Sequence, residues 1–318
     1  MKIGGKITGY NEGGNKMAIT AAMVKTLRER TGSGMMDCKK ALVEAEGDIE
    51  KAIELLREKG LAKAAKKAGR VAAEGLVRIA FNEDSTQAAI VEVNSETDFV
   101  AQNEEFKVFV EDIARAALAH GEDDMDTFLA EDIGGKTVNE ELTAKIAKIG
   151  ENLKLRRYEK ASEEGVVYVG YIHGGGRIGV IIGLKTDATA EEVATVGKDV
   201  AMQVASMDPK FVSEKEVDAE YLASERRILT EEVKNEGKKP EIIDKIVDGK
   251  IKKELKEVCL VDQAFVKDSD ISVKQYVDGA AKEIGKDIEI VSMIRYEVGE
   301  GIEKKEDDFA AEVAAAVK

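Results

Sequence analysis

The segment 173–179, which reads HGGGRIG, holds the residue types most often linked to chemistry. Its glycine spacing matches a dinucleotide-binding fingerprint, but that site needs a helix directly after the glycines, and a strand-like run, 178–184, follows instead. The string also resembles the oxyanion loop of esterases. The chain lacks a Gly-x-Ser-x-Gly elbow, however, and His120 is its only other histidine. We interpret the segment as a flexible hairpin that presents His173 and Arg177 to a partner, with a purely structural turn as the alternative.

The other candidate sites for chemistry are incomplete. Residues 135–137 (GKT) resemble the end of a phosphate-binding loop, but Ala130 stands where its first glycine belongs. The acidic clusters 122–124 and 303–308 lack the spacing of a calcium loop. Cys38 and Cys259 form neither a disulfide framework nor a zinc motif, which indicates a reducing compartment. We expect a protein that is not an enzyme and has no cofactor or metal of its own.

Asp98 and Phe99 form the most informative pair. They lie in a polar segment between a strand-like run, 88–93, and a helical pattern that begins near Asn103. A phenylalanine on such a loop stands out in a chain with 5% aromatic residues and no Trp. Phe99 either packs onto the protein's own core or anchors in a partner's pocket, and Asp98 either caps the following helix or acts on the partner.

Met35 and Met36 follow a Gly-Ser-Gly turn at the start of a predicted helix. Paired methionines at such a place are often core residues, although their adaptable side chains also suit partner surfaces. One of them could face inward and the other outward.

Composition restricts the partner. Of the 318 residues, 35% are charged, and the net charge is −15. Nucleic-acid binding needs clustered positive charge, so we expect a protein partner and no nucleic acid. No apolar run approaches the ~20 residues that span a bilayer, so we expect no membrane association and a cytoplasmic location.

The elements that position these residues divide into an N-terminal and a central part. Residues 1–16 read as a disordered leader or tag. Residues 17–60 predict a three-helix bundle of the ubiquitin-associated type: Thr20 caps its first helix, and the third runs from Asp48 to Gly60. A helical or flexible linker, 61–75, follows. A strand pair, a helix and a return strand then occur twice, first at 76–81, 88–93, 104–118 and 153–158, and again at 166–172, 178–184, 190–206 and 288–296.

We therefore predict an α+β fold with a duplicated antiparallel sheet and helix core. One subdomain is 76–160, and the other combines 161–212 with 259–302. The charged segment 213–258 predicts an inserted antiparallel helical hairpin, a coiled coil that turns near Gly237 and Pro240. In 303–318, Phe309, Val313 and Val317 form the apolar stripe of a C-terminal helix.

Several motifs together resemble the elongation factor Ts family. The strongest are residues 27–42 (LRERTGSGMMDCKKAL) and 92–100 (EVNSETDFV), and weaker matches lie at 148–152 (KIGEN), 173–180 and 295–302 (RYEVGEGI). The resemblance covers residues 17–317. One small departure is Gln102, where the family favours a basic residue or Asn.

The resemblance implies a guanine nucleotide exchange factor for elongation factor Tu that needs no cofactor. It places Thr97, Asp98, Phe99 and Val100 near the Mg²⁺ that bridges Tu and GDP. It also assigns partner contacts to Arg28, Met35, Met36 and Lys39 in the bundle and to Ile149 and His173 in the core. A homodimer and a 2:2 complex with Tu both stay open. The alternative function is a passive protein-binding module that uses the N-terminal bundle.

Overall fold

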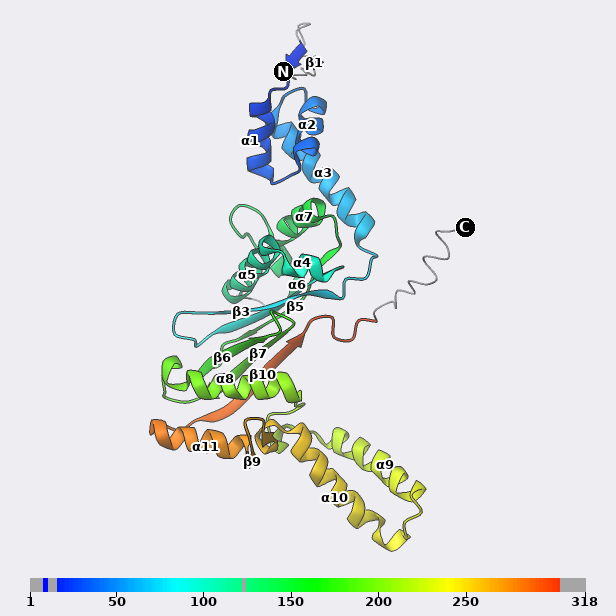
Figure 1. The fold of residues 1–318 in the computed structure, drawn as a ribbon, viewed down its shortest axis with the longest axis vertical. Helices are drawn as coiled ribbons and strands as arrows, with labels where there is room; N and C mark the ends of the chain where they lie inside the picture. The colour runs from blue at the N-terminus through cyan, green and yellow to red at the C-terminus, as the bar shows by residue number, and fades with distance from the viewer. Residues whose placement is uncertain (1–7, 11–15, 122–123, 304–318) are drawn as a thin grey trace.

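The computed structural model describes residues 8–10, 16–121 and 124–303. The molecule is elongated, with a helical bundle at one end, a helical hairpin at the other, and two stacked sheets between them (Figure 1). This arrangement is the α+β class that the sequence predicts.

The N-terminal bundle consists of α1 (Ala21–Thr31), α2 (Met35–Glu44) and α3 (Ile49–Lys67). Thr20 and Asp48 cap α1 and α3 as expected, because their side chains accept hydrogen bonds from backbone N–H groups of the first helical turn. The predicted end of the third helix at Gly60 is wrong. Gly60 is buried against Ala147 of α7 (Val138–Ile149), and this packing stabilises α3 as far as Lys67.

The predicted leader, residues 1–16, includes one short strand. This strand, β1 (Thr8–Tyr10), pairs antiparallel with β2 (Lys16–Ala18), which begins at the last residue of the predicted leader. Residues 1–7 and 11–15 lie outside the described part of the chain.

The central region contains two three-stranded antiparallel sheets with the same topology. The first has the order β3 (Glu74–Phe81), β4 (Ala88–Ser95), β5 (Leu153–Ala161), and the second has the order β6 (Val166–His173), β7 (Ile178–Lys185), β10 (Glu289–Glu297). The helix α5 (Glu104–Ala119) packs on the first sheet, and α8 (Ala190–Met207) packs on the second. Hairpin, helix and return strand therefore occur twice, as predicted.

The inner faces of the two sheets pack on each other. Val77 and Ile90 from the first sheet meet Tyr168, Ile181 and Tyr296 from the second in one buried cluster. The core thus has four layers, helix, sheet, sheet and helix, which Figure 1 shows between the bundle and the hairpin. Every residue of β4 is buried, and its first four residues, 88–91, form an apolar run.

The predicted helical hairpin is present as α9 (Ala219–Asn235) and α10 (Pro240–Val258). Its seam is built on Val233, Ile243 and Val247. The sequence also did not predict four helices, α4 (Asp98–Gln102), α6 (Met125–Ala130), α7 and α11 (Val273–Ile284), or the strand pair β8 (Ala264–Phe265) with β9 (Asp268–Ser272).

The predicted C-terminal helix with Phe309, Val313 and Val317 lies outside the described residues. Within the described ranges, no helix is both long enough and apolar enough to cross a bilayer.

Candidate partner-binding surface

The segment around Phe99 is a short helix, not the loop that the sequence predicts. Asp98 opens α4, which has five residues, and Phe99 is 81% exposed. The hypothesis that Phe99 packs onto the protein's own core is therefore wrong. Asp98 is also exposed, and it does not cap the next helix. Asn103 does so, because its Oδ1 accepts hydrogen bonds from the N–H groups of Glu105 and Phe106.

The backbone beneath Phe99 is held on both sides. After it, Val100 and Ala101 are buried in the core of the first subdomain. Before it, the carboxylate of Glu151 accepts hydrogen bonds from both the N–H and the hydroxyl of Thr97, at 3.0 and 2.7 Å. Val100 therefore anchors the turn inside the protein, whereas Asp98 and Phe99 face solvent.

Ile149 belongs to the same neighbourhood. It is the last residue of α7 and packs half-buried against the first core. The chain then turns at Gly150, which has a φ of 91°, and the N–H of Asn152 donates to Glu96 at 2.5 Å. Two hydrogen bonds thus join the end of α7 to the segment that carries Phe99. Glu151, after α7, accepts from the backbone of Thr97, and Glu96, before α4, accepts from the backbone of Asn152. The sequence identifies Thr97 and Ile149 as candidate partner-binding residues, but it does not identify Glu96 and Glu151, whose hydrogen bonds connect the two segments.

His173 also lies at this end of the sheets. It is exposed at the end of β6, and its Nδ1 lies 2.9 Å from the hydroxyl of Tyr171. The glycine turn after it is tied to β3, since the N–H of Val77 donates to the carbonyl of Gly176. Because the start of β3 pairs with the end of β4, the glycine turn and α4 lie at the same end of the first sheet.

The glycine turn is packed at its last glycine. Gly176 is buried with a φ of 116°, and an added Cβ would clash with Arg78 and Leu76, whereas Gly174 and Gly175 are exposed. Arg177 forms an ion pair of 3.1 Å with Glu74 of β3. His173 is therefore presented from a fixed support, and Arg177 is engaged within the chain.

The bundle carries a second exposed apolar site. Met35 and Met36 are each 60% exposed. The interpretation of the two methionines as core residues is therefore wrong, and so is the alternative that one of them faces inward. Arg28 is exposed and Lys39 is half-buried. These four residues lie on the bundle, which α3 connects to the core, and the structure does not place them on the α4 surface (Figure 1).

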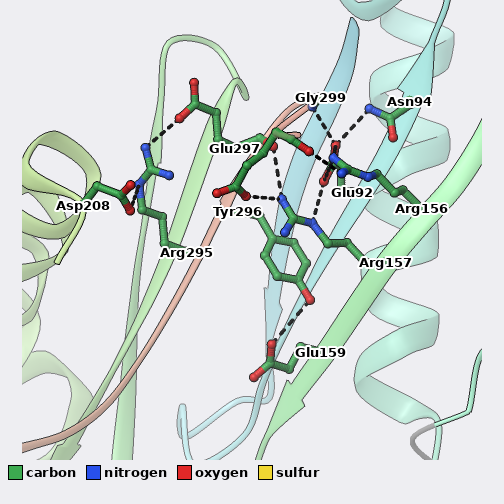
Figure 2. Close-up of polar contacts among 11 residues, drawn as sticks. Glu92, Asn94, Arg156, Arg157, Glu159, Asp208, Arg295, Tyr296, Glu297 and Gly299 are labelled. Carbon is green, nitrogen blue, oxygen red and sulfur yellow. Dashed lines mark hydrogen bonds and ion pairs between the residues drawn. The ribbon is translucent and has the colours of Figure 1, made fainter. Parts of the chain in front are cut away.

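A buried charge cluster is centred on Glu92 of β4 (Figure 2). The Glu92 carboxylate is fully buried and accepts hydrogen bonds from Arg156, Arg157, Asn94 and the N–H of Gly299. Burial alone would raise the pKa of Glu92, but these hydrogen bonds outweigh it and hold that pKa below its usual value. The cluster fastens the segment after β10, in the second subdomain, to the central strand of the first.

The described residues include neither a candidate metal cluster nor an activated thiol. No group of three or more His, Cys, Asp or Glu among them could hold a metal ion. Both cysteines are buried, and burial raises their thiol pKa, that of Cys259 to about 11, so neither is an activated nucleophile. A cleft of about 900 Å³ lies between the bundle and the core, where Gly60 and Lys63 of α3 face Thr143 and Ala147 of α7.

Exposed apolar side chains on fixed supports, without a catalytic group beside them, are typical of a protein that acts by binding another protein. Comparison with known proteins gives the family. The family described as "Elongation factor TS" matches residues 96–300, and this chain belongs to it.

Similar proteins cover nearly the whole chain. Elongation factor Ts of Clostridioides difficile is 60% identical over 94% of this chain and 99% of its own length. The Clostridium perfringens protein is 54% identical over 93% and 98%, and that of a Nitratiruptor species is 52% identical over 95% and 100%. A role in translation elongation follows from this membership.

Proposed function

We propose that this chain is a guanine nucleotide exchange factor that binds elongation factor Tu with GDP bound and accelerates GDP release. The observation that carries the proposal is Phe99, a large apolar side chain that is 81% exposed on a turn fixed at both ends. An exposed phenylalanine gains free energy when a partner buries it, and a rigid support reduces the entropy cost of that step. The family membership supports elongation factor Tu as this partner.

Asp98 and Phe99 would act on the nucleotide site of Tu together. Phe99 would enter an apolar pocket of Tu, while the exposed Asp98 carboxylate would disturb the groups that support the bound Mg²⁺. Much of the affinity of a GTPase for GDP comes from Mg²⁺ and phosphate contacts, so weakening them lowers the barrier to release. The coupling is reciprocal: a factor that weakens GDP binding is itself bound less tightly by Tu with GDP.

Phe99 cannot account for the whole effect. Burial of one phenylalanine yields roughly 1.5–3 kcal/mol, and about 1.4 kcal/mol corresponds to a tenfold change in rate. A wide interface must therefore contribute. Arg28, Met35, Met36 and Lys39 on the bundle, with Ile149 and His173 on the core, are the residues that we propose for it, and Thr97 and Val100 would position the turn. The chain would make or break no covalent bond.

The experiment is stopped-flow release of a fluorescent GDP from purified elongation factor Tu, with and without this protein. We expect release to accelerate and to saturate with the concentration of the chain. A complex that forms without any acceleration would refute the exchange function and leave a passive binding module built on the bundle.

A further inference from the structure

The threonine that precedes α4 behaves differently from the threonines that cap other described helices. At Thr20, Thr137 and Thr189 the side-chain oxygen accepts a hydrogen bond from an N–H in the first turn of the helix that follows. Thr97 holds the same position before α4 but makes no such bond. Its hydroxyl donates to Glu151 instead, at 2.7 Å. The start of α4 is therefore oriented by a residue 54 positions away and not by its own cap.

The Glu151 carboxylate is well placed for this task. α7 begins with a complete capping box at Thr137 and ends at Gly150, whose left-handed backbone redirects the chain. Glu151 follows at once and uses both oxygens, one for the N–H and one for the hydroxyl of Thr97. Hydrogen bonds to an ionised acceptor are stronger than neutral ones, and two from one residue restrict its rotation.

The remaining contacts restrict the same short segment. The hydroxyl of Ser95 donates a hydrogen bond to the carbonyl of Thr97 at 2.9 Å, and the carboxylate of Glu96 accepts one from the N–H of Asn152. Val100 is buried in the core on the other side. Phe99 therefore projects from a stretch of backbone that is fixed two residues before it and one residue after it. Glu151 accepts two of the three hydrogen bonds that hold the earlier point, and the Ser95 hydroxyl donates the third.

We propose that Glu151 is a positioning residue for nucleotide exchange, which acts by holding Thr97 so that Phe99 projects in one orientation. This inference rests on the proposed exchange function and extends it, because it assigns the presentation of Phe99 to a residue outside its own helix. Glu151 itself is half-buried and fully engaged with Thr97. Its effect on exchange passes through Phe99.

The first test needs no partner. Hydrogen exchange of the segment 94–102 is measured by mass spectrometry in the parent protein and in Glu151→Ala, with Glu151→Gln as the conservative variant. We expect faster exchange in Glu151→Ala and an intermediate rate in Glu151→Gln, because the amide oxygen replaces one of the two acceptors. The control is Glu83→Ala, which removes the same charge from the exposed turn at the far end of β4. Unchanged protection in Glu151→Ala would overturn the proposal.

The second test is a double-mutant cycle in the GDP-release assay. Glu151→Ala should slow exchange about tenfold, a loss that corresponds to about 1.4 kcal/mol of activation free energy. In a Phe99→Ala background the same change should have little further effect, because a residue that acts through Phe99 has nothing left to position. Effects that simply add would show that Glu151 acts independently of Phe99 and would overturn the proposal.

The outcomes separate this inference from the proposed function. If the parent accelerates release and Phe99→Ala slows it while Glu151→Ala does not, the inference fails and the exchange function stands. If the parent fails to accelerate release, both fail. A variant that merely unfolds is recognised by its hydrogen exchange, which would then rise throughout the chain and not in 94–102 alone.

Discussion

Replacement of Glu92 by glutamine should weaken the connection between the two subdomains. The Glu92 carboxylate has no exposed surface, and its donors lie at 2.6 Å (Arg157), 2.8 Å (Gly299), 2.9 Å (Asn94) and 3.0 Å (Arg156). Glutamine has nearly the same shape, but its NH2 group is a donor and would face the N–H donors that now bond to the carboxylate. The negative charge that pairs with Arg156 and Arg157 would also be lost. The change therefore removes the charge and one of the two acceptor oxygens, and it leaves the packing intact.

The magnitude follows from the burial of the three charged groups. Breaking a buried ion pair costs about 3–5 kcal/mol when the remaining charge stays buried. The side chains of Arg156 and Arg157 are 23% and 30% exposed, so water compensates part of this loss. We expect a decrease of about 3 kcal/mol in the free energy of unfolding at neutral pH. Because the cluster also holds Gly299, hydrogen exchange around that residue should accelerate.

The assay is urea denaturation of the full chain at neutral pH, with Glu300→Gln as the matched control. Glu300 pairs with the same Arg157, but its side chain is 47% exposed, and exposed pairs contribute about 0–1 kcal/mol. Glu92→Gln should therefore be clearly less stable than Glu300→Gln. Equal stability of the two variants would refute the reasoning that the buried carboxylate fastens the subdomains.

The pH dependence of stability provides a second readout of the same group. The pKa of Glu92 is lower in the folded chain, so its contribution is present above the unfolded value, about 4.3, and is lost as pH falls through the folded pKa. The parent should lose stability over this acid range more steeply than Glu92→Gln. Parallel curves for the two proteins would contradict the assignment.

Two further predictions concern the partner surface. The combined change Met35→Ala and Met36→Ala should leave thermal unfolding nearly unchanged, since both side chains are 60% exposed, but should weaken binding to elongation factor Tu by about 1–3 kcal/mol in titration calorimetry. Unaltered binding would remove both residues from the interface. Gly176→Ala should lower stability by about 1–3 kcal/mol in urea denaturation, because its φ is 116° and a Cβ would clash with Arg78 and Leu76. Gly175→Ala, where nothing lies within 4 Å of the added Cβ, should cost less, and a reversed order would contradict the packed turn.

The duplicated core could be predicted from the sequence because its elements have strong patterns. The apolar run of β4 and the apolar face of α5, with Phe106, Phe109 and Ile113, need no knowledge of distant residues. α7 was missed although its signals were present: Thr137 and Glu140 form a capping box, and Val138, Leu142 and Ile146 repeat at every fourth position. The end of α3 was misplaced because glycine usually marks a helix end, and only the contact with α7 overrides that signal at Gly60.

The candidate site could be predicted only in part. The sequence identifies Asp98 and Phe99 as candidates, but their exposure depends on which face of α4 packs on the core. In the structure this face carries Val100 and Ala101, so Asp98 and Phe99 remain exposed. The bond between Thr97 and Glu151 joins positions 54 residues apart, and no local pattern reports such a contact. The exposure of Met35 and Met36 likewise depends on how the three helices of the bundle pack.

The measurement that tests the central claim most directly is the maximal rate of GDP release from elongation factor Tu at saturating concentrations of the parent chain and of Phe99→Ala. Phe99 is 81% exposed, so its replacement should leave unfolding within about 0.5 kcal/mol of the parent. The maximal rate should nevertheless fall about tenfold or more, because the wedge and its burial energy are lost. Equal maximal rates for the two proteins would contradict the account, since exchange would then proceed without the side chain on which it rests.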